Sequence, residues 1–124
     1  MSRHRAPLVL AALLGAAGVM HFRKPEFFDA IVPEQLPGGP RLWTELSGAA
    51  ELAVAAAVAV PATRRVGGLA AATLFAAVFP ANVKMALDWK GRSAPERALA
   101  YGRLPLQIPL VLWALKVRRD TPPR

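Results

Sequence analysis

Four long apolar blocks, separated by short charged or proline-rich segments, constrain the fold of this chain more than any other feature of its sequence. The blocks cover about residues 6–22, 42–60, 66–89 and 98–117. A helix that crosses a membrane needs about 20 apolar residues, within a range of about 17–25. All four blocks reach this length, although the first is near the short limit. We therefore predict an all-α fold: an integral membrane four-helix bundle that forms a single domain over residues 1–124.

The first block also fits a cleaved signal peptide, because basic residues precede it. No clear small-residue cleavage site follows it, since the chain continues directly into HFRKPEFF, and three further apolar blocks come after it. We therefore expect the first block to remain in the protein as a membrane span.

Turn and capping signals lie between and within the blocks. The segment PATRR at residues 61–65 predicts a tight turn between the second and third helices. Ser93, followed three residues later by Glu96, predicts a capping box at the start of the fourth helix. Prolines lack the amide hydrogen that a helix needs, so kinks and unpaired carbonyls are expected near three of them, Pro80, Pro105 and Pro109.

The first loop, between the first two blocks, is longer than the others. Pro25 suits the first turn of a short helix, and Phe27, Phe28 and Ile31 would share one face of it. We expect this short interfacial helix to lie on the membrane surface, with those three side chains in the lipid interface. An ordinary loop whose aromatic side chains pack on the bundle fits the sequence equally well.

The net charge of +8 arises from basic residues at the ends of the apolar blocks. No basic helix face with interleaved aromatic residues is present, so the pattern is typical of membrane flanks and argues against nucleic acid as a partner. The side that holds both termini and the 61–65 turn carries eight Lys and Arg residues, against six on the other side. This small excess favours both termini in the cytoplasm. The chain has no cysteine, which excludes disulfides, thiol redox chemistry and thiolate metal sites.

Polar side chains within the blocks concentrate in the half of the bundle that faces away from the termini. A charge that faces lipid near the membrane centre costs about 2.5–3.5 kcal/mol, so these side chains are expected to face the interior and to pair. We expect the ion pairs Glu51–Lys84 and Glu45–Arg103, beside a cavity that opens to the outer leaflet. No catalytic residue and no metal ligand is assigned. The candidate ligand-binding cluster consists of His21, Glu45, Glu51, Asn82, Lys84, Arg103 and Gln107.

Four stretches together resemble the DoxX-like family of small bacterial membrane proteins: GVMHFRKPEFFDAIVPEQLP, SGAAELAVAAAVAVP, AVFPANVKMA and RLPLQIPLVLWAL. The resemblance covers nearly the whole chain. It implies a four-helix bundle in the bacterial cytoplasmic (inner) membrane, with links to membrane oxidoreductases and oxidative stress. The positions that match the family are His21, Glu51, Asn82, Arg103 and Gln107, and no catalytic role comes with them.

These observations favour a multi-pass protein that acts as an accessory or partner subunit of a quinone-linked membrane oxidoreductase. His21 and Arg103 would hydrogen-bond a quinone carbonyl at the outer interface. The alternatives are a carrier or channel for small molecules or ions, which predicts a homo-oligomer, and a purely structural bundle. The sequence shows no nucleophile–base pair, metal cluster or phosphate-binding loop, so an enzyme that acts on its own is disfavoured.

Overall fold

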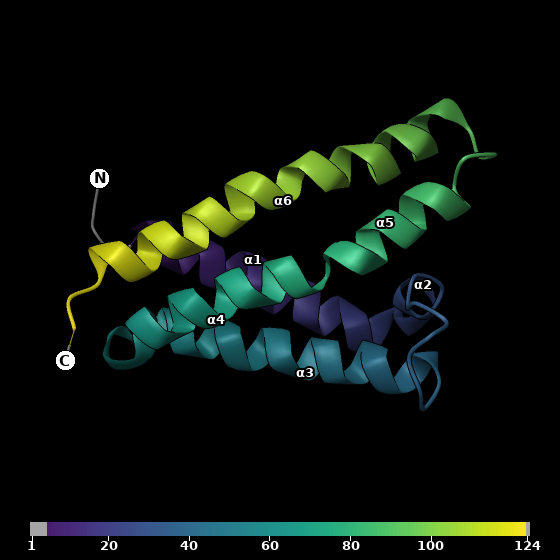
Figure 1. Ribbon diagram of the computed structural model, residues 1–124. Coiled ribbons are helices and arrows are strands. Elements are labelled where there is room, and N and C mark those ends of the chain that lie inside the picture. The colour runs from purple at the N-terminus through teal and green to yellow at the C-terminus, as the bar shows by residue number, and fades with distance from the viewer. Residues whose placement is uncertain (1–4, 124) are drawn as a thin grey trace.

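The computed structural model describes residues 5–123 as an assembly of helices, and this part of the chain contains no β-strand. Figure 1 shows the helices running back and forth along one direction. In chain order they are α1 (Arg5–Arg23), α2 (Pro25–Asp29), α3 (Pro40–Ala59), the 3-10 helix η1 (Pro61–Thr63), α4 (Arg64–Ala77), α5 (Phe79–Asp88) and α6 (Ala94–Asp120).

Four helical segments are long and apolar enough to cross a membrane: α1, α3, the combined segment Pro61–Asp88 and α6. Large apolar side chains on each of them are exposed, as expected of a surface that contacts lipid, for example Leu13, Leu46, Leu69 and Ile108. The predicted all-α class is confirmed, and the four spans are compatible with a multi-pass membrane protein. The fourth span is longer than its apolar block, because α6 has 27 residues.

The two ends of the bundle differ in the helix ends and connections that lie there. At one end, which we call the terminal end, α1 begins, α6 ends and η1 joins α3 to α4 (Figure 1). At the opposite end, which we call the loop end, lie α2, the start of α3 and the short connection between α5 and α6.

The predicted turn and cap are both confirmed. Within PATRR, the Thr63 hydroxyl donates to the carbonyl oxygen of Ala57 at 2.7 Å, and this bond ties η1 to the last turn of α3. At the start of α6, the Glu96 amide donates to the Ser93 hydroxyl at 3.4 Å, and that hydroxyl donates to the Glu96 carboxylate at 2.8 Å. The backbone of Ser93 also hydrogen-bonds the Glu96 carboxylate, which completes the reciprocal capping box that the Ser93–Glu96 spacing predicts.

The third span is interrupted where Pro80 was expected to disturb it. Helix α4 ends at Ala77 and α5 begins at Phe79, with Pro80 in its first turn. Val78 joins the two, since its amide donates to the carbonyl oxygen of Leu74 at 3.1 Å while its own carbonyl accepts from the Asn82 amide at 3.2 Å. Pro105 and Pro109, in contrast, lie inside the continuous helix α6.

The short helix α2 begins at Pro25 as predicted. The expectation that all three apolar side chains of this segment face the lipid is wrong. Only Phe27 of the three side chains is exposed, at 38%. The ring of Phe28 stacks on that of His21 with 3.7 Å between centroids, and Ile31 is buried in a small core with Met85 and other residues. Because α2 ends at Asp29, after five residues, Ile31 lies beyond the helix and does not share a helical face with Phe27 and Phe28. Its side chain is buried in the bundle instead. Phe28 and Ile31 therefore pack on the bundle, as in the alternative that the sequence left open.

Small residues allow the helices to approach closely near the terminal end. A Cβ atom on Gly67 would lie 2.7 Å from the backbone nitrogen of Val58 in α3, and one on Gly68 would lie 2.9 Å from the carbonyl oxygen of Ala114 in α6. Helix α4 is therefore wedged between α3 and α6 with little room for side chains. The core around it is apolar and includes Leu10, Leu14, Val58, Ala71 and Phe75.

Candidate functional site

Close packing of α1 on α3 brings His21 and Glu51 together. A Cβ atom on Gly48 would lie 2.7 Å from the Cβ of His21, so a glycine at this point lets the two helices touch. His21 Nδ1 lies 2.7 Å from the carbonyl oxygen of Ala17 and 3.2 Å from Oε2 of Glu51. Because a carbonyl oxygen can only accept, the hydrogen on Nδ1 points to Ala17. Glu51 Oε2 is therefore near the imidazole without receiving its hydrogen bond.

Arg103 of α6 belongs to the same group of residues. Its charge interacts with both His21 and Glu51. Its Nη1 also contacts the sulfur of Met85 at 3.1 Å, and this contact joins α6 to α5. Asn82 precedes Met85 by three residues, and Gln107 follows Arg103 by four, so each lies about one helical turn from this contact.

Several polar atoms in this region are buried without a partner among the described residues. They are both amide atoms of Asn82, Oε2 of Glu51 and Oε1 of Gln107. Asn82 is only 1% exposed, and a buried amide without hydrogen bonds costs about 1–3 kcal/mol in protein mutational data. Buried polar groups without a partner are rare in folded proteins, and a bound water, ion or other molecule is one explanation for them. We define the polar cluster as His21, Glu51, Asn82, Arg103 and Gln107.

Two residues expected in the site lie elsewhere, and both predicted ion pairs are wrong. Lys84 pairs with Asp88 of its own helix at 2.5 Å. It follows Asn82 by two residues, which turns it about 200° around the helix axis. Glu45 is exposed beside the buried Thr44, and its charge interacts with Arg41 one turn earlier. Of the remaining five predicted site residues, His21, Glu51 and Arg103 interact with one another. Asn82 and Gln107 are grouped with them because each lies about one helical turn from the contact between Arg103 and Met85.

A network in the first loop supports the cluster and was not foreseen. Asp29, the last residue of α2, accepts hydrogen bonds from Arg41 Nε at 3.0 Å and from the Thr44 hydroxyl at 2.6 Å. The bond from Arg41, helped by that from Thr44, lowers the pKa of the Asp29 carboxyl below its usual value. These bonds fix α2 on the first turns of α3, and so hold Phe28 against His21. No local sequence signal reveals them, because the partners are 12 and 15 residues apart.

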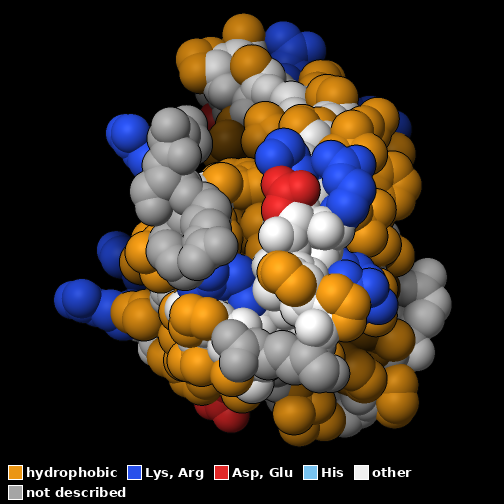
Figure 2. All heavy atoms as spheres, turned by 90° about the vertical axis from the view of Figure 1, so that its left-hand side faces the viewer, with side chains coloured by type: hydrophobic (Ala, Val, Ile, Leu, Met, Phe, Trp, Pro, Cys, Tyr) orange, Lys and Arg blue, Asp and Glu red, His pale blue; other side chains and the backbone are white. Residues whose placement is uncertain are grey.

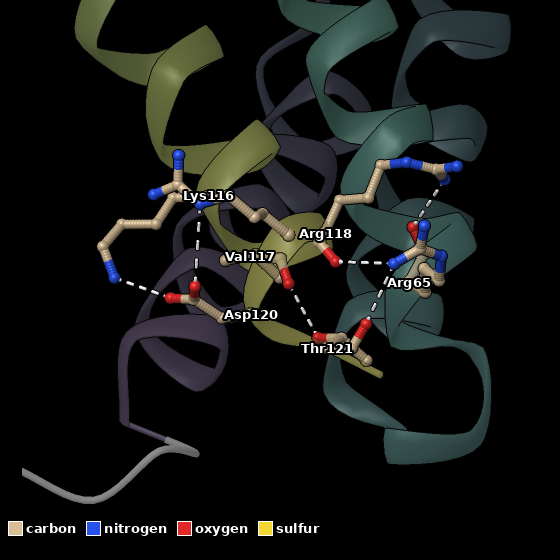
Figure 3. A network of polar contacts seen from close by, with 7 residues as sticks. Arg65, Lys116, Val117, Arg118, Asp120 and Thr121 are labelled. Carbon is tan, nitrogen blue, oxygen red and sulfur yellow. Dashed lines mark hydrogen bonds and ion pairs between the residues drawn. The ribbon is translucent and has the colours of Figure 1, made fainter. Parts of the chain in front are cut away.

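A second network lies at the terminal end, where α6 meets the start of α4 (Figure 3). Arg65 Nη1 donates to the carbonyl oxygens of Arg118 at 3.4 Å and Thr121 at 3.2 Å. In return, Arg118 Nη1 donates to the carbonyl oxygen of Arg65 at 3.3 Å. The sequence suggested only flanking charges for these two arginines. Their reciprocal contact joins residues 53 positions apart.

The structure shows no metal site in the part of the chain that it describes. Among residues 5–123, no group of three or more His, Asp or Glu side chains could hold a metal ion. The chemistry of the polar cluster is instead that of hydrogen bonding, with oxygen acceptors, amide and guanidinium donors, and an aromatic ring beside the imidazole.

The profile of a family described as "Domain of unknown function (DUF8561)" matches residues 10–118. No curated protein and no solved structure matches the chain. The resemblance to the DoxX-like family is therefore wrong, since the profile that matches is that of an uncharacterised family and nothing links the chain to DoxX. Three of the four stretches that suggested it consist largely of Ala, Leu, Val and Pro, which are common in membrane helices. The expectation of a redox partner loses the support that it took from this resemblance.

Proposed function

The chain belongs to the DUF8561 family, whose function is unknown, and from its own residues we propose that it is a multi-pass membrane protein that binds a small amphipathic molecule at the polar cluster. The observation that carries this proposal is Asn82, which is fully buried although neither of its amide atoms has a partner among the described residues. A purely structural bundle gains nothing from such a residue, because leucine at this position would avoid the cost of desolvating the amide.

The unpaired atoms indicate which ligand chemistry fits. Three of them, on Glu51, Asn82 and Gln107, are oxygens that accept hydrogen bonds, and the fourth is the Asn82 amide nitrogen, which donates. A ligand that bears hydroxyl or amine hydrogens satisfies the oxygens, and one acceptor atom on it satisfies the nitrogen. Its apolar part would extend along the exposed apolar side chains into the bilayer.

A quinone meets these requirements only in its reduced form. The oxidised ring offers carbonyl oxygens, which accept and leave the three protein oxygens without hydrogen. The reduced ring, a quinol, carries two hydroxyl groups and a flat surface of the kind that Phe28 and Met85 would cover. If the bound molecule is a quinol, the protein would act as an accessory subunit of a quinone-linked membrane system. A partner protein would then take the two electrons and oxidise the quinol.

The alternative of a carrier or channel has less support. The half of the bundle toward the terminal end is filled by an apolar core that contains Leu14, Val58 and Phe75. A polar path from the cluster to the terminal end would have to cross this core. If the excess of basic residues places both termini in the cytoplasm of a bacterial cell, the cluster lies in the outer half of the inner membrane.

Native mass spectrometry of the protein purified in a mild detergent from its native membrane, combined with extraction and identification of bound molecules, tests the proposal. We expect a reproducible small amphipathic molecule in the wild-type protein and its loss in Asn82→Leu and Arg103→Leu. Lys84→Gln is the matched control, because it removes a charge from α5 outside the cluster. A molecule that is absent from the wild-type protein, or retained equally by all variants, would contradict the proposal.

A further inference from the structure

The arginine pair at the terminal end has donor groups beyond those that its contacts use. Each guanidinium carries five N–H hydrogens on three nitrogens. In the described contacts, Arg65 and Arg118 each use only Nη1, and each donates only to backbone carbonyls. Both side chains are partly buried between α4 and α6. Two groups of the same charge are thus held together by neutral acceptors, without a carboxylate between them in the described part of the chain.

The surroundings of the pair are also positive. Arg64 is buried beside it and donates to the carbonyl oxygens of Val58 and Ala59. The acidic residue of this end, Asp120, pairs with Lys116 at 2.7 Å and lies 3.9 Å from Arg119, so its charge is already shared. Figure 2, which looks onto the terminal end, shows several Lys and Arg side chains and few acidic ones.

The start of α4 adds to this positive field. Its first turn contains no acidic residue, and no side chain caps it. The amino-terminal end of a helix carries a partial positive charge, which basic residues in the first turn do not offset. A negatively charged group close to Arg65 would therefore interact favourably with the helix end and with both guanidinium groups.

We propose that Arg65 and Arg118 bind the phosphate of an anionic phospholipid in the leaflet at the terminal end. Guanidinium groups match phosphate oxygens in geometry and can donate two parallel hydrogen bonds. A lipid is a better occupant than a soluble phosphate because apolar side chains continue the site toward the membrane centre. Leu69 follows Arg65 by four residues and Leu115 precedes Arg118 by three, and both are exposed. Acyl chains attached to the phosphate would lie along them.

The test is a titration of the detergent-purified full-length protein with phosphatidylglycerol, phosphatidylcholine or inorganic phosphate, followed by native mass spectrometry. We expect the wild-type protein to retain phosphatidylglycerol in preference to phosphatidylcholine. Each basic group near an anionic lipid contributes to the free energy of lipid binding. The double variant Arg65→Gln/Arg118→Gln should therefore bind phosphatidylglycerol roughly 30-fold more weakly than the wild type. The double variant Lys116→Gln/Arg119→Gln is the matched control, since it also removes two charges from this end but leaves the arginine pair intact.

Three outcomes would overturn the proposal. Equal retention of the two lipids would remove the preference itself, and equal losses in the two double variants would assign it to general surface charge. Binding of inorganic phosphate as tight as that of the lipid would identify a soluble anion as the occupant. If the glutamine variant does not fold, Arg65→Lys/Arg118→Lys retains both charges without the planar donors. It should still bind phosphatidylglycerol several-fold more weakly than the wild type, and unchanged binding would contradict the role of the guanidinium geometry.

Discussion

Replacement of Asn82 by leucine gives the sharpest test of the polar cluster. The two side chains branch at the same carbon, so the substitution keeps the shape of the side chain and removes its polar atoms. Asn82 is 1% exposed and has no hydrogen-bond partner among the described residues. The ligand-free protein therefore bears the cost of an unpaired buried amide, about 1–3 kcal/mol. We expect Asn82→Leu to stabilise the ligand-free protein by about this amount.

A bound ligand should reverse the order of stabilities. A ligand at a concentration 100 times its dissociation constant adds about 2.7 kcal/mol to the stability of the protein that binds it. The wild-type protein would gain this stabilisation, whereas Asn82→Leu would gain little, because the leucine cannot hydrogen-bond the ligand. The variant would thus be the more stable protein without ligand and would lose this advantage with it.

Equilibrium unfolding in mixed micelles, with and without the lipid extract of the native membrane, measures both effects. Leu14→Met is a suitable control, because Leu14 is fully buried in the apolar core outside the polar cluster and a volume-conserving change of this kind costs less than about 1.5 kcal/mol. If Asn82→Leu destabilised the ligand-free protein by more than the control, the amide would have a partner in the folded protein. The argument for a binding site at Asn82 would then be refuted.

Three further predictions concern residues outside the polar cluster. Lys84→Gln should change the free energy of unfolding by less than about 0.5 kcal/mol, because Lys84 pairs only with Asp88 on its own helix in the described structure; a much larger loss in the same unfolding assay would indicate a partner on another helix. Gly67→Ala should destabilise the protein by about 1–3 kcal/mol, since its Cβ would lie 2.7 Å from the backbone of α3, and an unchanged unfolding midpoint would contradict this. The pKa of Asp29 is lowered, first by its hydrogen bond from Arg41, so its stabilising effect is complete above the unfolded value of 3.8 and is lost as the pH falls through the lower folded value. Thermal unfolding of wild type and Asp29→Asn between neutral and strongly acidic pH checks this, and the difference between the two proteins should shrink only at the acidic end.

The sequence predicted features of the fold that depend on local chemistry. The length of the apolar blocks gave the four spans, the Ser93–Glu96 spacing gave the cap of α6, and Pro80 marked the interruption of the third span. Each of these signals lies within a few residues of the structure that it specifies. The boundary of α6 was less accurate, since polar residues at both of its ends extend it beyond the apolar block.

The partners of the polar side chains were harder to predict. The sequence indicates depth along a helix, but depth does not specify direction around the helix axis. Lys84 and Asn82 are two residues apart, so they point to different sides of α5, and this rotation separates Lys84 from Glu51. The contact between Arg65 and Arg118 could not be predicted from charge, because it joins two like-charged side chains through backbone carbonyls.

The interruption at Val78 has a consequence for how related chains can diverge. Because α5 does not continue the axis of α4, the position of Asn82 depends on what packs against α5, namely α6 and the buried Ile31 of the first loop. Substitutions in that loop can therefore move Asn82 relative to Glu51 and Arg103 without altering any residue of the cluster. If the proposed ligand binds at the cluster, selection for a larger or smaller one would act on the loop, while the polar residues themselves stay the same.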